Sequence, residues 1–107
     1  MLNNRVDVTV TVNSESQLQP IVVTHSNVEV SPTNTMLLPE NLNRKYVLIA
    51  NNSDVDVYVS FGVDANIGSG IPINAGGSYE MSANYISNSQ INAISEESGV
   101  LLITEGV

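Results

Sequence analysis

Few side chains in this sequence are able to do acid, base or nucleophilic chemistry. Acyl-transfer catalysis needs a nucleophile, a base and an orienting group in one place. The only histidine, His25, follows a β-branched run, and no recognisable serine motif accompanies it. Glu96 and Glu97 are adjacent, and adjacent residues of an extended chain point to opposite faces, so they do not form a glycosidase carboxylate pair. We therefore expect a strand-end histidine, a solvated hairpin tip and no enzyme.

Carboxylates that recur along one face of a strand are candidate calcium ligands. Asp54 and Asp56 share one face and Asp64 follows, but their spacing matches no EF-hand loop, so we favour solvated acids on a polar face. The chain has no cysteine, which excludes disulfides and thiolate metal ligands. Two glycine-rich stretches, residues 68–70 and 76–77, lack the lysine and the following helix of a phosphate loop. We expect no metal and no cofactor.

Tyrosine offers a flat apolar face with a hydroxyl group, a combination that suits stacking on sugars. The four tyrosines allow two interpretations, a sugar-stacking platform or packing at the core edge or at a subunit interface, where tyrosine is common. We favour packing. The residues concerned are Tyr46, Tyr58, Tyr79 and Tyr85.

Charge excludes some classes of partner. Eleven acidic residues and three basic ones (Arg5, Arg44 and Lys45) give a net charge of -8, which repels phosphate backbones and anionic lipid headgroups. Nucleic acid and membranes are therefore not expected as partners. Only 13% of the residues are charged, about half the usual share. A surface that is largely neutral and polar suits packing beside neighbouring proteins.

The length and the apolar content indicate one folded domain. At 107 residues, 42% of them apolar, the chain can enclose a core but not two, so we expect a single domain over residues 1–107. Valines alternate with polar residues over residues 6–12, which predicts a half-buried strand. Residues 21–24 predict a second strand. Shorter strands, expected at an edge, follow at residues 27–30 and 36–38.

The middle of the chain carries the clearest strand patterns. Residues 46–50 are apolar at both odd and even positions, which predicts a central strand covered on both faces. Residues 55–63 alternate without a break, and the turn-forming residues 51–54 lie between the two runs, so together they suggest a hairpin. Residues 62–77 contain several glycines and Pro72, which predicts a long irregular loop holding one short strand.

Three more strand-like runs end the chain, around residues 78–81, 91–94 and 100–103, with turn signals between them. No window of helical length keeps apolar residues at three-and-four spacing, so any helix is a short turn. About seven to nine short strands with frequent turns predict an all-β domain, either a β-sandwich or a jelly-roll-like small barrel.

From residue 44 to residue 105 the order of these elements resembles a group of small phage virion proteins that includes head decoration and cement proteins. The likeness begins at Arg44-Lys45-Tyr46-Val47-Leu48-Ile49 and at Val57-Tyr58-Val59-Ser60-Phe61-Gly62. It continues through Gly70-Ile71-Pro72-Ile73, Gly76-Gly77-Ser78-Tyr79-Glu80, Ile91-Asn92-Ala93-Ile94-Ser95 and Leu102-Ile103-Thr104-Glu105-Gly106.

The resemblance implies a non-enzymatic virion structural protein on the capsid surface. Such a protein is a symmetric oligomer, expected to be a homotrimer, and it binds the major capsid protein and stabilises the shell. Residues 1–35 lie outside the resemblance and form a candidate partner-contacting segment. Its strand at residues 6–12 either pairs with an open sheet edge on a partner or is an ordinary internal strand, and we favour the internal strand because a strand inside its own sheet leaves no open edge. We expect partner contacts at Val6, Val8, Val10, Arg44, Tyr58, Ile67 and Ile71.

An alternative function from another class is a carbohydrate- or receptor-binding module of a phage tail or fibre. It would use the loop over residues 62–77 together with the tyrosines. Loss of glycan binding in Tyr58→Ala or Tyr79→Ala would favour that alternative.

Overall fold

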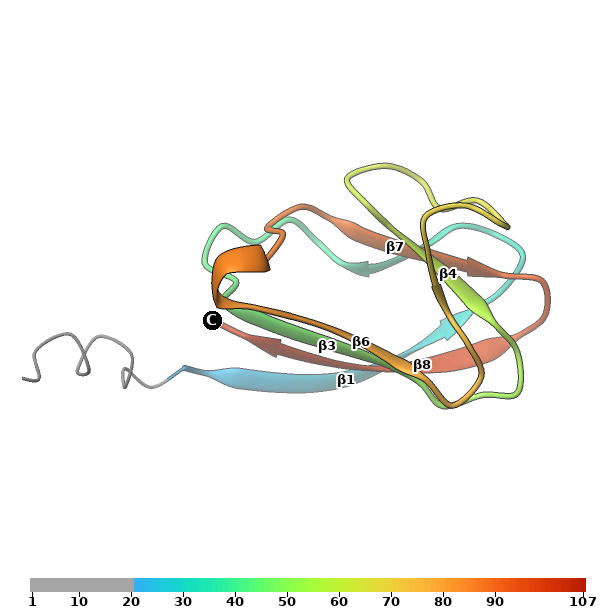
Figure 1. The fold of residues 1–107 in the computed structure, drawn as a ribbon, viewed down its shortest axis with the longest axis horizontal. Coiled ribbons are helices and arrows are strands. Elements are labelled where there is room, and N and C mark those ends of the chain that lie inside the picture. The colour runs from blue at the N-terminus through green and yellow to red at the C-terminus, as the bar shows by residue number, and fades with distance from the viewer. Residues whose placement is uncertain (1–20) are drawn as a thin grey trace, which may run out of the picture.

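Two four-stranded antiparallel sheets pack face to face in the computed structural model, which describes residues 21–107 (Figure 1). The strands of one sheet lie in the order β1-β8-β3-β6 and those of the other in the order β2-β7-β4-β5. A 3-10 turn, η2, follows β6. The elements are β1 Val23–Val30, β2 Thr35–Leu38, β3 Tyr46–Asn51, β4 Val57–Phe61, β5 Ile71–Ile73, β6 Ser78–Ser82, η2 Ala83–Tyr85, β7 Ile91–Ser95 and β8 Gly99–Gly106.

The strand order is that of a jelly roll. The first strand pairs with the eighth, the second with the seventh, the third with the sixth and the fourth with the fifth, all antiparallel. This is the pattern of one long hairpin of four strand pairs wrapped around a core, which is how a double-sheet jelly roll limits its exposed edges. The predicted all-β class is confirmed, and the eight strands of the described residues fall within the expected number.

The core forms because alternate residues of each strand face the opposite sheet. In β3 the side chains of Val47 and Ile49 are fully buried, and in β4 those of Val57 and Val59 are. Each buried aliphatic side chain contributes about 1.5–3 kcal/mol to the stability of the fold. The remaining fully or almost fully buried apolar side chains come from both sheets: Val30, Ile73, Ile91, Ala93, Leu101 and Ile103.

Two expectations about strands are wrong. Residues 21–24 and 27–30 do not belong to separate strands, because β1 runs without a break from Val23 to Val30 beside the whole of β8. The predicted hairpin between residues 46–50 and 55–63 does not form either, since β3 and β4 lie in different sheets. The turn residues between them carry the chain across the core, and local alternation does not distinguish such a crossing from a hairpin.

The expected central strand is β3, and it is paired on both sides, with β8 and with β6. It is not covered on both faces, however. Tyr46, Leu48 and Ala50 point away from the core and are half-buried on the outer face of their sheet. The even-numbered apolar residues of β3 therefore form part of the protein surface.

The predicted long loop with one short strand is confirmed. The strand is β5, which pairs with β4 and has Pro72 in its middle. Gly70 precedes it with a φ of 82°, and a Cβ at this position would lie 2.4 Å from the carbonyl oxygen of Val59. The close approach of the two backbones and the positive φ together require glycine here.

Candidate functional site

His25, the only histidine, lies on β1 and is exposed. Its Nδ1 is 2.9 Å from the hydroxyl of Thr104 on the neighbouring strand β8, and within residues 21–107 no carboxylate hydrogen-bonds to the ring. The ring lines a shallow hollow of about 430 Å³ on the outer face of this sheet, whose floor includes Leu48, Ala50 and Leu102. The geometry offers a partly apolar surface, and the described residues place no nucleophile–base pair there.

The aspartates considered as calcium ligands do not converge. The carboxylate of Asp56 accepts a hydrogen bond from the amide of Ala75 at 3.1 Å, and that of Asp64 accepts one from the side chain of Asn34 at 3.3 Å. Within residues 21–107 no group of three or more histidine, aspartate or glutamate side chains is arranged to hold a metal ion. These acids have local structural roles in loops.

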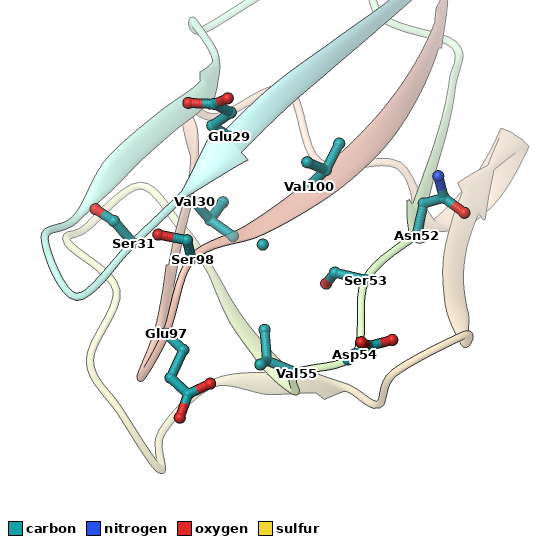
Figure 2. Close-up of a pocket in the computed structure, with 11 residues that line it drawn as sticks. Glu29, Val30, Ser31, Asn52, Ser53, Asp54, Val55, Glu97, Ser98 and Val100 are labelled. Carbon is teal, nitrogen blue, oxygen red and sulfur yellow. The ribbon is translucent and has the colours of Figure 1, made fainter.

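A hollow of about 640 Å³ lies at the end of the sandwich where the β1–β2, β3–β4 and β7–β8 loops meet. Figure 2 shows that the carboxylates of Glu29, Asp54 and Glu97 stand apart around its rim and do not point toward one another. Small residues form much of the remainder, among them Ser53 and Gly99. The carboxylates are therefore spread over the rim of the hollow, and we call this end of the sandwich the acidic end.

The opposite end of the sandwich is organised by the buried side chain of Arg44. Its Nε donates to Glu105 at 2.8 Å, and its Nη2 donates to the carbonyl of Pro39 at 2.8 Å. Its Nη1 donates to the carbonyls of Ser87 and Ser89 at 2.8 and 2.9 Å. Only 2% of Arg44 is exposed. Its four hydrogen bonds tie the β2–β3 loop, the β6–β7 loop and β8 together.

Asn88 reinforces this tie. The amide of Asn41 donates to the carbonyl of Asn88 at 2.9 Å, and the side chain of Asn88 donates back to the carbonyls of Asn41 and Arg44. The two loops are thus held at fixed distances by backbone and side-chain bonds. Arg44 was expected to contact a partner, but its guanidinium is directed into the protomer, where it fixes the loops that carry other exposed residues.

The loops held by Arg44 carry exposed apolar side chains. Leu42 is 78% exposed at the tip of the β2–β3 loop, and Tyr85 is 85% exposed on η2. The start of β1 lies at the same end (Figure 1). Nine large apolar side chains are exposed in residues 21–107, and we call the five that lie at the start of β1, on the β2–β3 loop and on η2 the apolar end: Ile21, Val22, Val23, Leu42 and Tyr85.

Sequence reasoning missed the apolar end. Its one local signal was Leu42, a lone leucine between Asn41 and Asn43 in a segment with no strand pattern. Tyr85 was considered only together with the other three tyrosines, for which packing at the core edge or at a subunit interface was favoured over a sugar platform.

The other residues expected to contact a partner are scattered. Val6, Val8 and Val10 lie outside the described residues. Tyr58 is half-buried on the outer face of β4, and Ile67 is 41% exposed on the β4–β5 loop. Ile71 on β5 packs against the core. The structure does not bring Tyr58, Ile67 and Ile71 together into one surface.

The four tyrosines do not form a platform. Tyr46 lies on the outer face of one sheet, where its hydroxyl donates to Glu80 at 2.6 Å, and Tyr58 lies on the outer face of the other. Tyr79 packs against the core with its ring centroid 6.3 Å from that of Phe61. Tyr85 stands alone on η2. Sugar stacking on several tyrosines at once is incompatible with this arrangement.

Comparison with known proteins gives little further information. No family model matches the chain, and no curated protein matches it. Among solved structures, one similar chain comes from work described as "Bacillus endospore appendages form a novel family of disulfide-linked pili", with a TM-score of 0.44 and 13% sequence identity over 82% of this chain and 89% of that chain. Within residues 21–107 no helix is both long and apolar enough to span a membrane.

Proposed function

We propose that this chain is a non-enzymatic structural protein of a phage particle, a capsid decoration or cement protein. It binds the major capsid protein at the capsid surface and stabilises the shell. It also associates with itself, and the resemblance of residues 44–105 implies a homotrimer. Many weak contacts repeated over a symmetric lattice give such a protein its effect.

The observation that carries this proposal is the apolar end. Single exposed apolar residues are normal on a protein surface, whereas a group of them at one end of a domain is typical of an interaction site. Leu42 and Tyr85 are among the most exposed apolar side chains described, and both project from loops held by Arg44. A contact surface on fixed loops loses little conformational entropy on binding.

The charge of the molecule supports a protein partner. Of the three basic residues, Arg44 is occupied inside the protomer, so the described surface offers little positive charge to nucleic acid. Tyrosine is also enriched at protein interfaces, because it combines a large apolar area with a polar tip. A neutral, polar surface with a few apolar projections fits a protein that docks on other proteins.

The test is a solution mass measurement followed by co-sedimentation with purified capsids that lack the protein. We expect a stable oligomer that saturates the capsids, and capsids that resist heating better once they are coated. A monomer that does not sediment with capsids would refute the proposal, and retention on a glycan array would favour the receptor-binding alternative.

Matched variants locate the contact. Leu42→Ser with Tyr85→Ser removes the two apolar projections without touching the core, and we expect it to weaken capsid binding or self-association at least tenfold. Leu102→Ser removes an exposed apolar side chain, 40% exposed, from the outer face of β8 toward the other end of the sandwich and serves as the control. Equal binding by both variants would exclude the apolar end as the contact.

A further inference from the structure

The four edge strands of the two sheets differ in how well they are protected against pairing with another strand. β5 has three residues with Pro72 in the middle, and proline donates no hydrogen bond to a neighbouring strand. β2 has four residues, and its register shifts between Met36 and Leu38. β6 has five residues with the charged Glu80 at its centre, and it ends in η2. Each of these edges carries a feature that discourages strand addition.

β1 has the fewest of these protective features. It is eight residues long, contains no proline or lysine, carries its one acid, Glu29, next to its last residue, and keeps a regular register with β8 over all eight pairs. The sheet order places β1 at the edge, so its other side is unpaired within residues 21–107 (Figure 1). A long and regular edge strand is a template for pairing with another strand.

The hydrogen bonds fix which groups β1 offers. Val22 and Val107 exchange both backbone bonds, at 2.8 and 2.9 Å, so they are a hydrogen-bonded pair of the antiparallel ladder. Because such pairs alternate, the even-numbered residues of β1 bond to β8. The odd-numbered residues direct their N–H and C=O groups to the open side: Val23, His25, Asn27 and Glu29.

We propose that the segment of residues 6–12 from a second copy of this chain adds to the open side of β1 as an antiparallel fifth strand. This inference rests on the proposed function as an assembling protein. Residues 6–12 alternate valine with polar residues and contain no proline or glycine, as an added strand requires. Twenty residues precede Ile21, enough chain to reach a neighbouring molecule.

The same segment is poorly placed to cover β1 of its own chain. The turn-forming residues 13–16 would make a hairpin in which residue 12 faces residue 17 and Val6 faces Val23, leaving His25, Asn27 and Glu29 uncovered. A turn nearer to β1 is opposed by Pro20, which favours an extended chain at residue 19. Val22 is held to Val107, so the strand is already extended there.

Charge favours one register. When Asp7 lies opposite His25, Arg5 lies opposite Asn27 and therefore diagonally beside Glu29, within reach of its carboxylate. Moving the segment by two residues toward residue 30 places Arg5 directly opposite Glu29 but brings Asp7 diagonally beside the same carboxylate. Moving it by four residues places Asp7 directly opposite Glu29, which is repulsive. In the favoured register Val6 and Val8 face Ser26 and Thr24, on the core side of β1, where both β1 residues are exposed. The added valines would cover that part of the sheet.

This contact is heterologous, because the donor segment and the acceptor edge are different surfaces. Heterologous contacts close into rings when the rotation between copies allows it. A three-membered ring would be the homotrimer of the proposed function, with each copy donating residues 6–12 to the next.

The absence of cysteine allows a clean cross-linking test. Val6→Cys and Ser26→Cys would face each other in a pair without mutual hydrogen bonds, about 4.5 Å apart at Cα, which a disulfide can span. We would mix the two full-length single variants and oxidise them, so that a disulfide between the two proteins can form only between copies. We expect this mixed disulfide, and much less of it when Val12→Cys, which falls beyond the strand in this register, replaces Val6→Cys. Each variant oxidised alone measures random collision.

Charge exchange tests the register. Arg5→Glu and Glu29→Arg should each weaken self-association roughly two- to fivefold, and the double variant should restore it. Failure of the mixed disulfide to exceed collision controls, or a disulfide within one chain in a monomeric Val6→Cys/Ser26→Cys double variant, would overturn the inference. Capsid binding without the mixed disulfide would leave the proposed function standing, whereas the disulfide without capsid binding would defeat the proposed function alone.

Discussion

The two ends of the sandwich are each organised around one buried polar side chain, but with different chemistry. At the apolar end Arg44 donates to three carbonyls and one carboxylate. At the acidic end Asn51, 2% exposed, donates to the carbonyls of Val55 and Ile73 at 2.7 and 2.9 Å and accepts from Ser53. A charged group therefore ties loops together at one end, and a neutral amide shapes a turn at the other.

The difference teaches what each end can do. A guanidinium reaches further than an amide and has five N–H groups in a rigid plane, so it holds two loops and a strand in fixed positions. A fixed surface suits docking, and the exposed apolar residues are found at that end. At the acidic end Asn51 stabilises the turn by which the chain crosses from β3 in one sheet to β4 in the other, and the loops there carry exposed acids.

The largest effect is expected at Arg44. Arg44→Met leaves the carboxylate of Glu105 and three carbonyls without their donor, so the free energy of unfolding should fall by about 3–5 kcal/mol. Chemical denaturation measures it. Lys45→Met, at an exposed neighbouring position, should change stability by no more than about 0.5 kcal/mol. A similar small loss for both variants would show that Arg44 does not organise its end.

The next effect concerns Asn51. Asn51→Ala removes the side-chain donor to the carbonyls of Val55 and Ile73, and the bond to Ile73 is buried. The free energy of unfolding should fall by about 1–3 kcal/mol. The exposed neighbour Asn52→Ala is the control and should stay within about 0.5 kcal/mol of the parent. If Asn51→Ala destabilised the protein more than Arg44→Met, the ranking of the two ends would be reversed.

Two glycines, one at each end of β8, allow each end of the sandwich to be perturbed separately. A Cβ at Gly106 would lie 2.8 Å from Cδ1 of Ile21 and 3.2 Å from Cβ of Tyr46, whereas one at Gly99 would meet Ser53 and Val55. Each alanine variant should cost about 1–3 kcal/mol through overpacking. By hydrogen exchange, only Gly106→Ala should expose the amides of Val22 and Val107. If Gly99→Ala exposed these amides as much as Gly106→Ala does, the two ends would not be independent.

The smallest effect is a pH dependence at the start of β3. The hydrogen bond that Tyr46 donates to Glu80 raises the pKa of the tyrosine, with smaller contributions from desolvation and from the nearby carboxylate charge. Since the folded-state pKa is raised, the stabilisation is complete below about pH 10 and disappears as the pH rises through the higher folded value. Absorbance titration should show one tyrosine ionising at lower pH in Glu80→Ala than in the parent protein, because alanine removes both the acceptor and the charge. Identical titration curves for the two proteins would contradict it.

The candidate site was only partly visible in the sequence. The exposed Leu42 stood out in a polar segment, but nothing local indicated that Arg44 is buried, because arginine is usually a surface residue. Its burial depends on carbonyls at residues 39, 87 and 89 and on Glu105, which are distant in the chain. A guanidinium expected to meet a partner instead supports the loops beside it.

The sequence by itself determined where most of the strands lie. Apolar runs and alternation with a period of two are local properties, so the strands predicted at residues 46–50, 55–63 and 91–94 could be placed without knowing their neighbours. These patterns did not show that the outer face of β3 belongs to the surface or that residues 23–30 form one strand. Tertiary structure alone decided which strands pair, that β3 and β4 lie in different sheets, and that β1 has an open side. Pairing depends on contacts between residues far apart in the chain, whose free energies no local pattern records.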